Sequence, residues 1–153
     1  MDVLTPYDLY VEGKGQEPLK PFTTGDELLE KSILTMEKLH PVFADNLRSM
    51  KANNRFDLNS RQGKAPGGYN CPMPVSRYPF IFMNAAGTQN DLHTFMHEGG
   101  HAMHSFCAAG VTSIFNHYPM EIAEVASMSM ELMSMYFRGT FYENAEDLKR
   151  AQK

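Results

Sequence analysis

The chain contains 153 residues, of which 42% are hydrophobic and 21% charged, a balance typical of a globular protein of one domain. Its net charge of −4, without a run of Lys or Arg, argues against a nucleic-acid-binding surface. Two cysteines are too few for a disulfide framework, the N-terminal MDVLTPYDLY lacks a signal-peptide pattern, and no apolar run is long enough to span a membrane. We therefore expect a cytoplasmic protein with no nucleic-acid or membrane partner.

The first third of the chain predicts an extended lead-in followed by helix. Residues 1–22 contain Gly and Pro without a helical period. Thr24 and Glu27 form a capping-box pattern, and apolar side chains then recur at helical spacing from Leu29 to Met50. Because Pro41 lacks an N–H, this segment is either two helices or one kinked helix.

Between residues 53 and 90 the sequence is rich in turn-forming residues and contains one strand candidate, YPFIFMN. Pro79 restricts that segment to the start of a strand or to an edge strand. An edge strand has unpaired backbone groups with which an extended peptide can pair, and small residues after it would let a peptide approach closely. The predicted peptide-binding residues are Phe80, Ile81, Phe82, Met83, Ala85, Ala86 and Gly87.

The second half of the chain predicts three helices. Thr88 and Asp91 repeat the capping pattern before a helix over about 90–108, which Gly110 is placed to end. A loop to about Pro119 precedes a helix through about Arg138, which is apolar nearly all round and is therefore expected to be buried. A final charged helix starts near residue 143.

The stretch TFMHEGGHAMHSF, residues 94–106, carries the main chemical signal. On a helix, His97 and His101 lie about 40° apart on adjacent turns, and Glu98 projects about 100° to the side of His97. This HExxH arrangement supplies two zinc ligands and a carboxylate that takes a proton from water on the metal. Two structural core histidines are the alternative, which the rarity of the motif and its position behind a cap disfavour. The Gly99-Gly100 pair weakens the helix and predicts a close approach by another helix or a ligand.

A catalytic zinc site needs a third protein ligand. The metzincin pattern fails because His104 and Cys107 stand where that motif has Gly and His. The apolar helix after Pro119 carries three acids on one face, and helical geometry alone does not choose among them. These acids are Glu121, Glu124 and Glu131.

DLHTFMHEGGHAMHSF followed by AEVASMSMEL resembles the oligoendopeptidase F and thimet oligopeptidase family of zinc peptidases. The segment GKAPGGYNCPMPVSRYPFIFMNAAGTQNDLHT is similar to the loop and strand before that family's zinc helix. The resemblance implies one Zn²⁺ ion held by His97, His101 and Glu124, with Glu98 as the catalytic base. A metal-bound histidine commonly donates its other N–H to a carboxylate. The candidates for such support of the ligands are Glu131, Glu121, His104 and His93, whereas His40 and His117 have no predicted role.

The predicted fold is therefore mainly α with a small β element. We expect residues 1–153 to form a zincin-like helical catalytic core, with a short edge-strand hairpin beside the HExxH helix. The predicted activity is zinc-dependent hydrolysis of short peptides, in which Glu98 takes a proton from water and passes it to the leaving amine. A di-iron bundle is disfavoured because the chain has only one Glu-x-x-His.

The resemblance also implies segments that this chain lacks. The family has a distal Tyr- and His-containing stretch that stabilises the oxyanion, and a long helical N-terminal region. We therefore expect a fragment of a longer protein, whose apolar faces the parent chain or a homo-oligomer would cover. The alternative function is a catalytically weak, zinc-bound module that binds metal or peptide.

Overall fold

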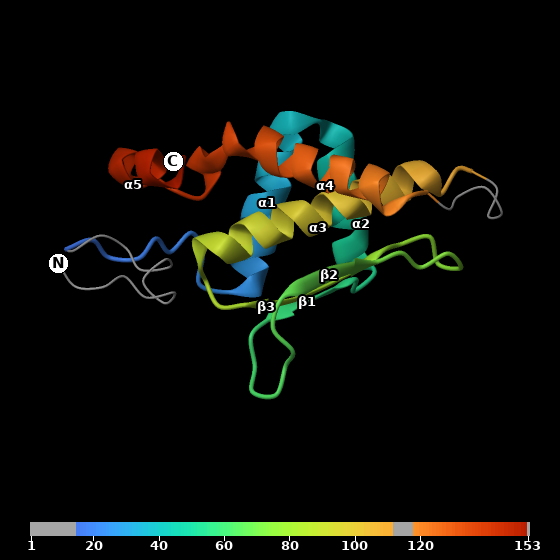
Figure 1. The fold of residues 1–153 in the computed structure, drawn as a ribbon, viewed down its shortest axis with the longest axis horizontal. Coiled ribbons are helices and arrows are strands. Elements are labelled where there is room, and N and C mark those ends of the chain that lie inside the picture. Colours follow the sequence, from blue (N-terminus) through green and yellow to red (C-terminus); the bar gives the residue numbers. More distant parts are fainter. Residues whose placement is uncertain (1–14, 112–117, 153) are drawn as a thin grey trace.

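The computed structural model describes residues 15–111 and 118–152. It has the predicted composition, mainly helices with one small sheet, which Figure 1 shows in chain order. The elements are α1 (Gly25–Leu39), α2 (Pro41–Ala52), β1 (Phe56–Asn59), β2 (Gly68–Cys71), β3 (Phe80–Ala85), α3 (Gln89–Ala108), α4 (Met120–Met135), the 3₁₀ helix η3 (Arg138–Thr140) and α5 (Ala145–Ala151). Most of the predicted lead-in, and His117 with most of the loop before Pro119, lie outside the described residues.

Local signals define the ends of the helices. Thr24 caps α1 by accepting a hydrogen bond from the Glu27 N–H, but the Glu27 carboxylate accepts from Thr23 instead of completing the box. The segment with Pro41 forms two helices, since α1 ends before His40 and α2 starts at the proline. His40, for which the sequence predicted no role, caps α2 through its ring nitrogen and the Val42 N–H.

The sheet has the strand order β1-β3-β2, with β1 parallel and β2 antiparallel to β3. The predicted strand is therefore the central one, and the prediction that it lies at an edge is wrong. Pro79 directly precedes β3 and removes no hydrogen bond from the ladder, so it permits a central position. The edge strand of the hairpin is β2, which comes from the turn-rich segment.

Helix α3 lies between α4 and the sheet, and α1 and α2 pack behind it (Figure 1). The core forms where these layers meet and includes fully buried side chains from both helical layers and from the sheet. Leu28, Met36, Leu47, Ile81 and Phe95 are 0% exposed. Burial of these apolar side chains fixes α3 firmly against its neighbours.

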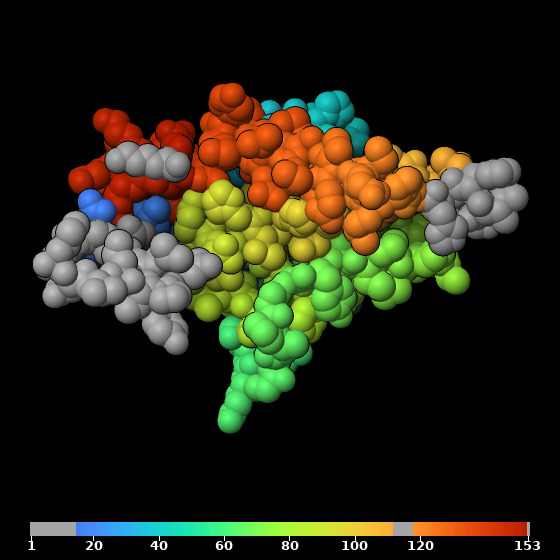
Figure 2. Space-filling model, in the orientation of Figure 1, coloured from blue at the N-terminus to red at the C-terminus, as the bar shows by residue number. Residues whose placement is uncertain are grey.

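Helix α4 is buried along one side only, so the prediction of a buried helix is wrong. Its small residues face α3, whereas Figure 2 shows the outer side of α4 uncovered. The exposed apolar residues on α4 and just after it are Met120, Ile122, Val125, Met128, Leu132, Met133 and Tyr136. The helix also ends at Met135, and Arg138 instead begins η3. Among the described residues, no helix is long and apolar enough to cross a membrane.

Candidate metal centre

Consecutive residues of α3 face different parts of the molecule. A Cβ added at Gly100 would lie 2.6 Å from the Ser127 Cα of α4, and one at Gly99 would lie 3.0 Å from the end of the Met36 side chain of α1. The predicted close approach of a helix to this glycine pair is thus confirmed. Because α4 comes within backbone contact of α3, acidic side chains on α4 can reach the histidines of α3.

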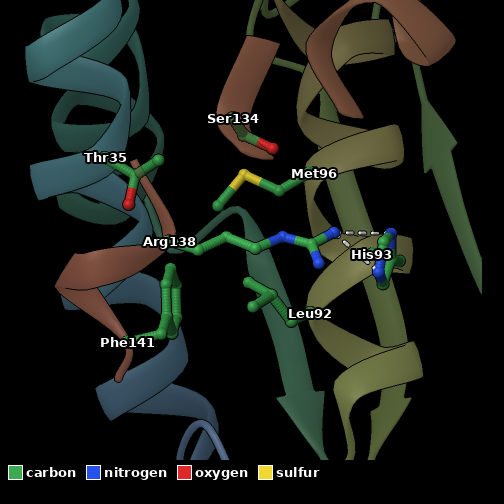
Figure 3. A pocket seen from close by; sticks show the side chains of 7 residues that line it. All are labelled: Thr35, Leu92, His93, Met96, Ser134, Arg138 and Phe141. Carbon is green, nitrogen blue, oxygen red and sulfur yellow. Dashed lines mark hydrogen bonds between the residues drawn. The ribbon is translucent and has the colours of Figure 1, made fainter. Parts of the chain in front are cut away.

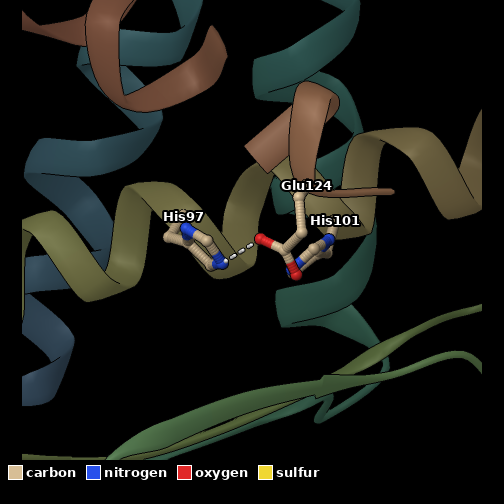
Figure 4. Close-up of side chains that lie close together, drawn as sticks. All are labelled: His97, His101 and Glu124. Atoms are coloured by element: carbon tan, nitrogen blue, oxygen red, sulfur yellow. Dashed lines mark ion pairs between the residues drawn. The ribbon is translucent and has the colours of Figure 1, made fainter. Parts of the chain in front are cut away.

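His97 and His101 lie side by side and face Glu124 of α4, as Figure 4 shows. The Glu124 carboxylate is 3.2 Å from His97 Nε2 and 3.6 Å from His101 Nε2. One ligand atom from each of the three residues lies within 4.8 Å of the others. Donors about 2.0–2.2 Å from a tetrahedral zinc are separated by roughly 3.3–3.5 Å, so this set of donors fits the ion.

Glu131, one of the acids considered as a third ligand, contacts the other side of the His97 ring. Its Oε1 lies 2.6 Å from His97 Nδ1. A carboxylate at this distance favours the proton on Nδ1, and the lone pair of Nε2 then faces Glu124 and His101. The structure therefore brings Glu131 to the candidate ligand His97, as expected for a residue that orients an imidazole.

Glu98 is 6% exposed, and its carboxyl group reaches the backbone of Asn70 on β2. Burial raises the pKa of its carboxyl group, while His97 and the backbone N–H of Asn70 on β2 act in the opposite direction. A carboxyl group that is less acidic than usual holds a proton more readily. Glu98 thus has both the position and the proton affinity of a general base next to the donor cluster.

Burial also acts on His101. It lowers the pKa of the imidazole, and the neighbouring His97 lowers it further. The neutral ring is the form that binds a metal. Burial and His97 therefore favour the neutral imidazole of His101.

His93 lies one turn before His97 but belongs to a separate polar cluster (Figure 3). Its Nε2 accepts a hydrogen bond of 2.7 Å from the buried Arg138 guanidinium, which also donates to the Ala151 carbonyl. Burial and the charge of Arg138 lower the pKa of His93. The residue therefore ties the start of α3 to the C-terminal segment and makes no contact with the donor cluster.

Two other predicted supporting residues, His104 and Glu121, form no hydrogen bond or ion pair with the donor cluster in the described residues, although the charge of His104 acts on His101 and lowers its pKa. The His104 ring stacks on Tyr118 with centroids 4.0 Å apart, and its buried Nδ1 has no hydrogen-bond partner in the described part of the chain. Glu121 is exposed and forms no hydrogen bond or ion pair within residues 15–111 and 118–152. Sequence reasoning missed Ser127 and Asn70, although the position of Ser127 three residues after Glu124 was available as a signal.

The predicted peptide-binding residues are poorly placed for that role. Phe80, Ile81, Phe82 and Met83 belong to the central strand, which pairs with β1 and β2. The prediction that a peptide adds to this strand as an edge is therefore wrong. Ala85 pairs with Asn59, and the Ala86 N–H donates to Asp91 at the start of α3. Ala85 is thus the last residue of β3, and Ala86 and Gly87 belong to the connection between β3 and α3.

Comparison with known proteins identifies relatives of this chain. The model of peptidase family M3 matches residues 2–153. Oligopeptidase PepF of Bacillus subtilis is 28% identical over 152 residues, which are 98% of this chain and 22% of that protein. An oligoendopeptidase F homolog of Mycoplasma genitalium is 37% identical over 140 residues, 91% of this chain and 23% of that protein.

Solved structures show the same fold. Pz peptidase A, solved with an inhibitor, superposes with a TM-score of 0.79 at 29% identity, over 90% of this chain and 27% of that one. A Bacillus anthracis protein assigned as an oligoendopeptidase F gives a TM-score of 0.86 at 28% identity, over 97% of this chain and 27% of that one. The chain thus spans about a fifth to a quarter of the length of the relatives it matches.

Proposed function

Because the chain belongs to peptidase family M3, we propose that it is the zinc-binding core of a metallopeptidase that hydrolyses peptide bonds in short peptides. The observation that carries this proposal is the meeting of His97, His101 and Glu124, on two different helices, with Glu98 beside them. A module that binds metal or peptide without catalysis is not favoured, since the matched relatives are oligopeptidases.

His97, His101 and Glu124 would hold one Zn²⁺ ion. When bound, such an ion lowers the pKa of a coordinated water and polarises the peptide carbonyl. Glu131 supports the set by fixing the orientation of the His97 ring through its contact with Nδ1. Two imidazoles and one carboxylate leave a fourth position open, which distinguishes catalytic from structural zinc sites.

Glu98 moves the proton in this proposal. Its carboxylate accepts a proton from the attacking water and then donates it to the nitrogen of the leaving amine. The raised pKa that burial gives this group favours the first transfer, because a stronger base takes the proton more readily. The Asn70 N–H restrains the carboxylate beside the sheet.

The peptide would bind along β2 instead of β3. In the described residues β2 pairs with one strand only, and it packs against α3, where the Asn70 backbone meets Glu98. A peptide that adds to the free edge of β2 would place its backbone next to the donor cluster. Main-chain hydrogen bonds of this kind bind peptides of many sequences, as an oligopeptidase requires.

Hydrolysis of an internally quenched fluorescent peptide tests the proposal. The zinc-loaded chain should cleave the peptide, and Glu98→Gln should bind zinc equally but cleave at least a hundredfold more slowly. Glu121→Gln is the matched control, because this exposed glutamate lies on α4 without a contact to the ligands. Absence of zinc from the purified chain, or equal cleavage by wild type and Glu98→Gln, would refute the proposal.

A further inference from the structure

Ser127 occupies the tightest point of the contact between α3 and α4. Its side chain is 0% exposed, and its Cα is the atom that a Cβ on Gly100 would meet at 2.6 Å. A residue larger than serine would separate the helices here. Alanine, however, has a higher helix propensity than serine and would bury no hydroxyl group, so packing alone does not explain the serine.

The hydroxyl group of Ser127 explains this choice because it reaches the predicted third ligand. Its Oγ lies 3.1 Å from Glu124 Oε2 and 3.0 Å from the Glu124 backbone oxygen. The same Oε2 lies 3.2 Å from His97 Nε2, and the other carboxylate oxygen, Oε1, lies 3.6 Å from His101 Nε2. The Glu124 side chain is 37% exposed, and the surrounding water does not hold the carboxylate in one orientation. The contact with Ser127 is therefore its main restraint from within α4.

Ser134, two turns further along α4, is the natural comparison. It is also buried, at 4% exposure, and its hydroxyl donates to the carbonyl oxygen three residues earlier, at 2.8 Å from Glu131 O. Ser134 has no hydrogen bond to a carboxylate. The two serines thus share burial, helix position and backbone contact, and they differ in the contact between Ser127 and Glu124.

We infer that Ser127 is a positioning residue for the metal site. Its hydroxyl holds Oε2 of Glu124 and so keeps the carboxylate turned toward His97 and His101. This inference rests on the proposed function, since it assumes that Glu124 is a ligand. Hydrogen-bonding partners of metal ligands typically contribute ten- to a hundredfold to metal affinity.

The test compares Ser127→Ala with Ser134→Ala in the same chain. Zinc affinity is measured by competition with a chromophoric chelator, and coordination is followed through the visible absorption of bound Co²⁺. Ser127→Ala should weaken zinc binding about tenfold and should change the Co²⁺ band, because the Glu124 carboxylate is no longer held in one orientation. Ser134→Ala should change neither, and urea unfolding should show both variants to be folded.

The outcomes separate this inference from the proposed function. If the wild-type chain binds neither Zn²⁺ nor Co²⁺, the proposed function itself fails. If the wild type binds both ions but Ser127→Ala matches it in affinity and in spectrum, Ser127 has only a packing role and the inference is wrong. The inference is equally wrong if Ser134→Ala weakens zinc binding as much as Ser127→Ala does.

Discussion

Substitution of Gly100 by alanine tests whether close contact between α3 and α4 builds the metal site. The added Cβ would lie 2.6 Å from Ser127 Cα and 2.8 Å from the Ala126 carbonyl oxygen, both of which are backbone atoms that cannot turn aside. Since carbon atoms prefer a separation of about 3.5–4.0 Å, the helices must move apart by roughly 1 Å. Overpacking of this kind costs about 1–3 kcal/mol, against a gain of about 1 kcal/mol in helix propensity.

We therefore expect Gly100→Ala to lower the free energy of unfolding by up to about 2 kcal/mol. It should also weaken zinc binding at least tenfold, because Glu124 moves with α4 and ligand distances tolerate only about 0.2 Å. Urea unfolding of the zinc-free chain and chelator competition measure the two effects.

Gly99→Ala is the matched control for this experiment. A Cβ at this neighbouring position meets only Met36 Cε, the far end of a flexible side chain, at 3.0 Å. Gly99→Ala should therefore leave zinc affinity unchanged and should be neutral or stabilising by up to about 1 kcal/mol. If the two variants have the same stability and the same zinc affinity, the argument from helix contact is refuted.

Two further predictions concern the acids around the histidines. Glu131→Ala should weaken zinc binding ten- to a hundredfold because the His97 ring loses the group that orients it. The control Glu121→Ala should bind zinc like the wild type. Equal zinc affinities of the two variants would contradict this prediction. In the zinc-free chain, burial raises the pKa of Glu98, so the protonated carboxyl group stabilises the folded state below about pH 4.5. This contribution to the free energy of unfolding is lost as the pH rises and the buried carboxyl group ionises. Urea unfolding in EDTA should then show Glu98→Gln to be more stable than the wild type at pH 8 but not at pH 4, and a difference independent of pH would count against this.

Several features of this protein followed from short stretches of sequence. The HExxH pattern places two imidazoles on one side of a helix whatever surrounds it, since one turn of helix fixes their relative direction. Thr88 and Asp91 form the predicted capping box, and Pro41 starts a new helix. These predictions held because the interactions involved join residues no more than four positions apart.

Contacts between distant segments decided the remaining features. The sequence of β3 does not specify that it pairs with Phe56–Asn59 on one side and Gly68–Cys71 on the other, so its central position was not predictable. Likewise, the apolar residues of α4 suggested burial on all sides, but only the side with Ala123, Ser127, Met130 and Ser134 is buried. Periodicity shows which residues share a face, whereas only packing shows which face is covered. The approach of α4 to Gly100, which brings Glu124 and Ser127 to the histidines, is a property of the tertiary structure alone.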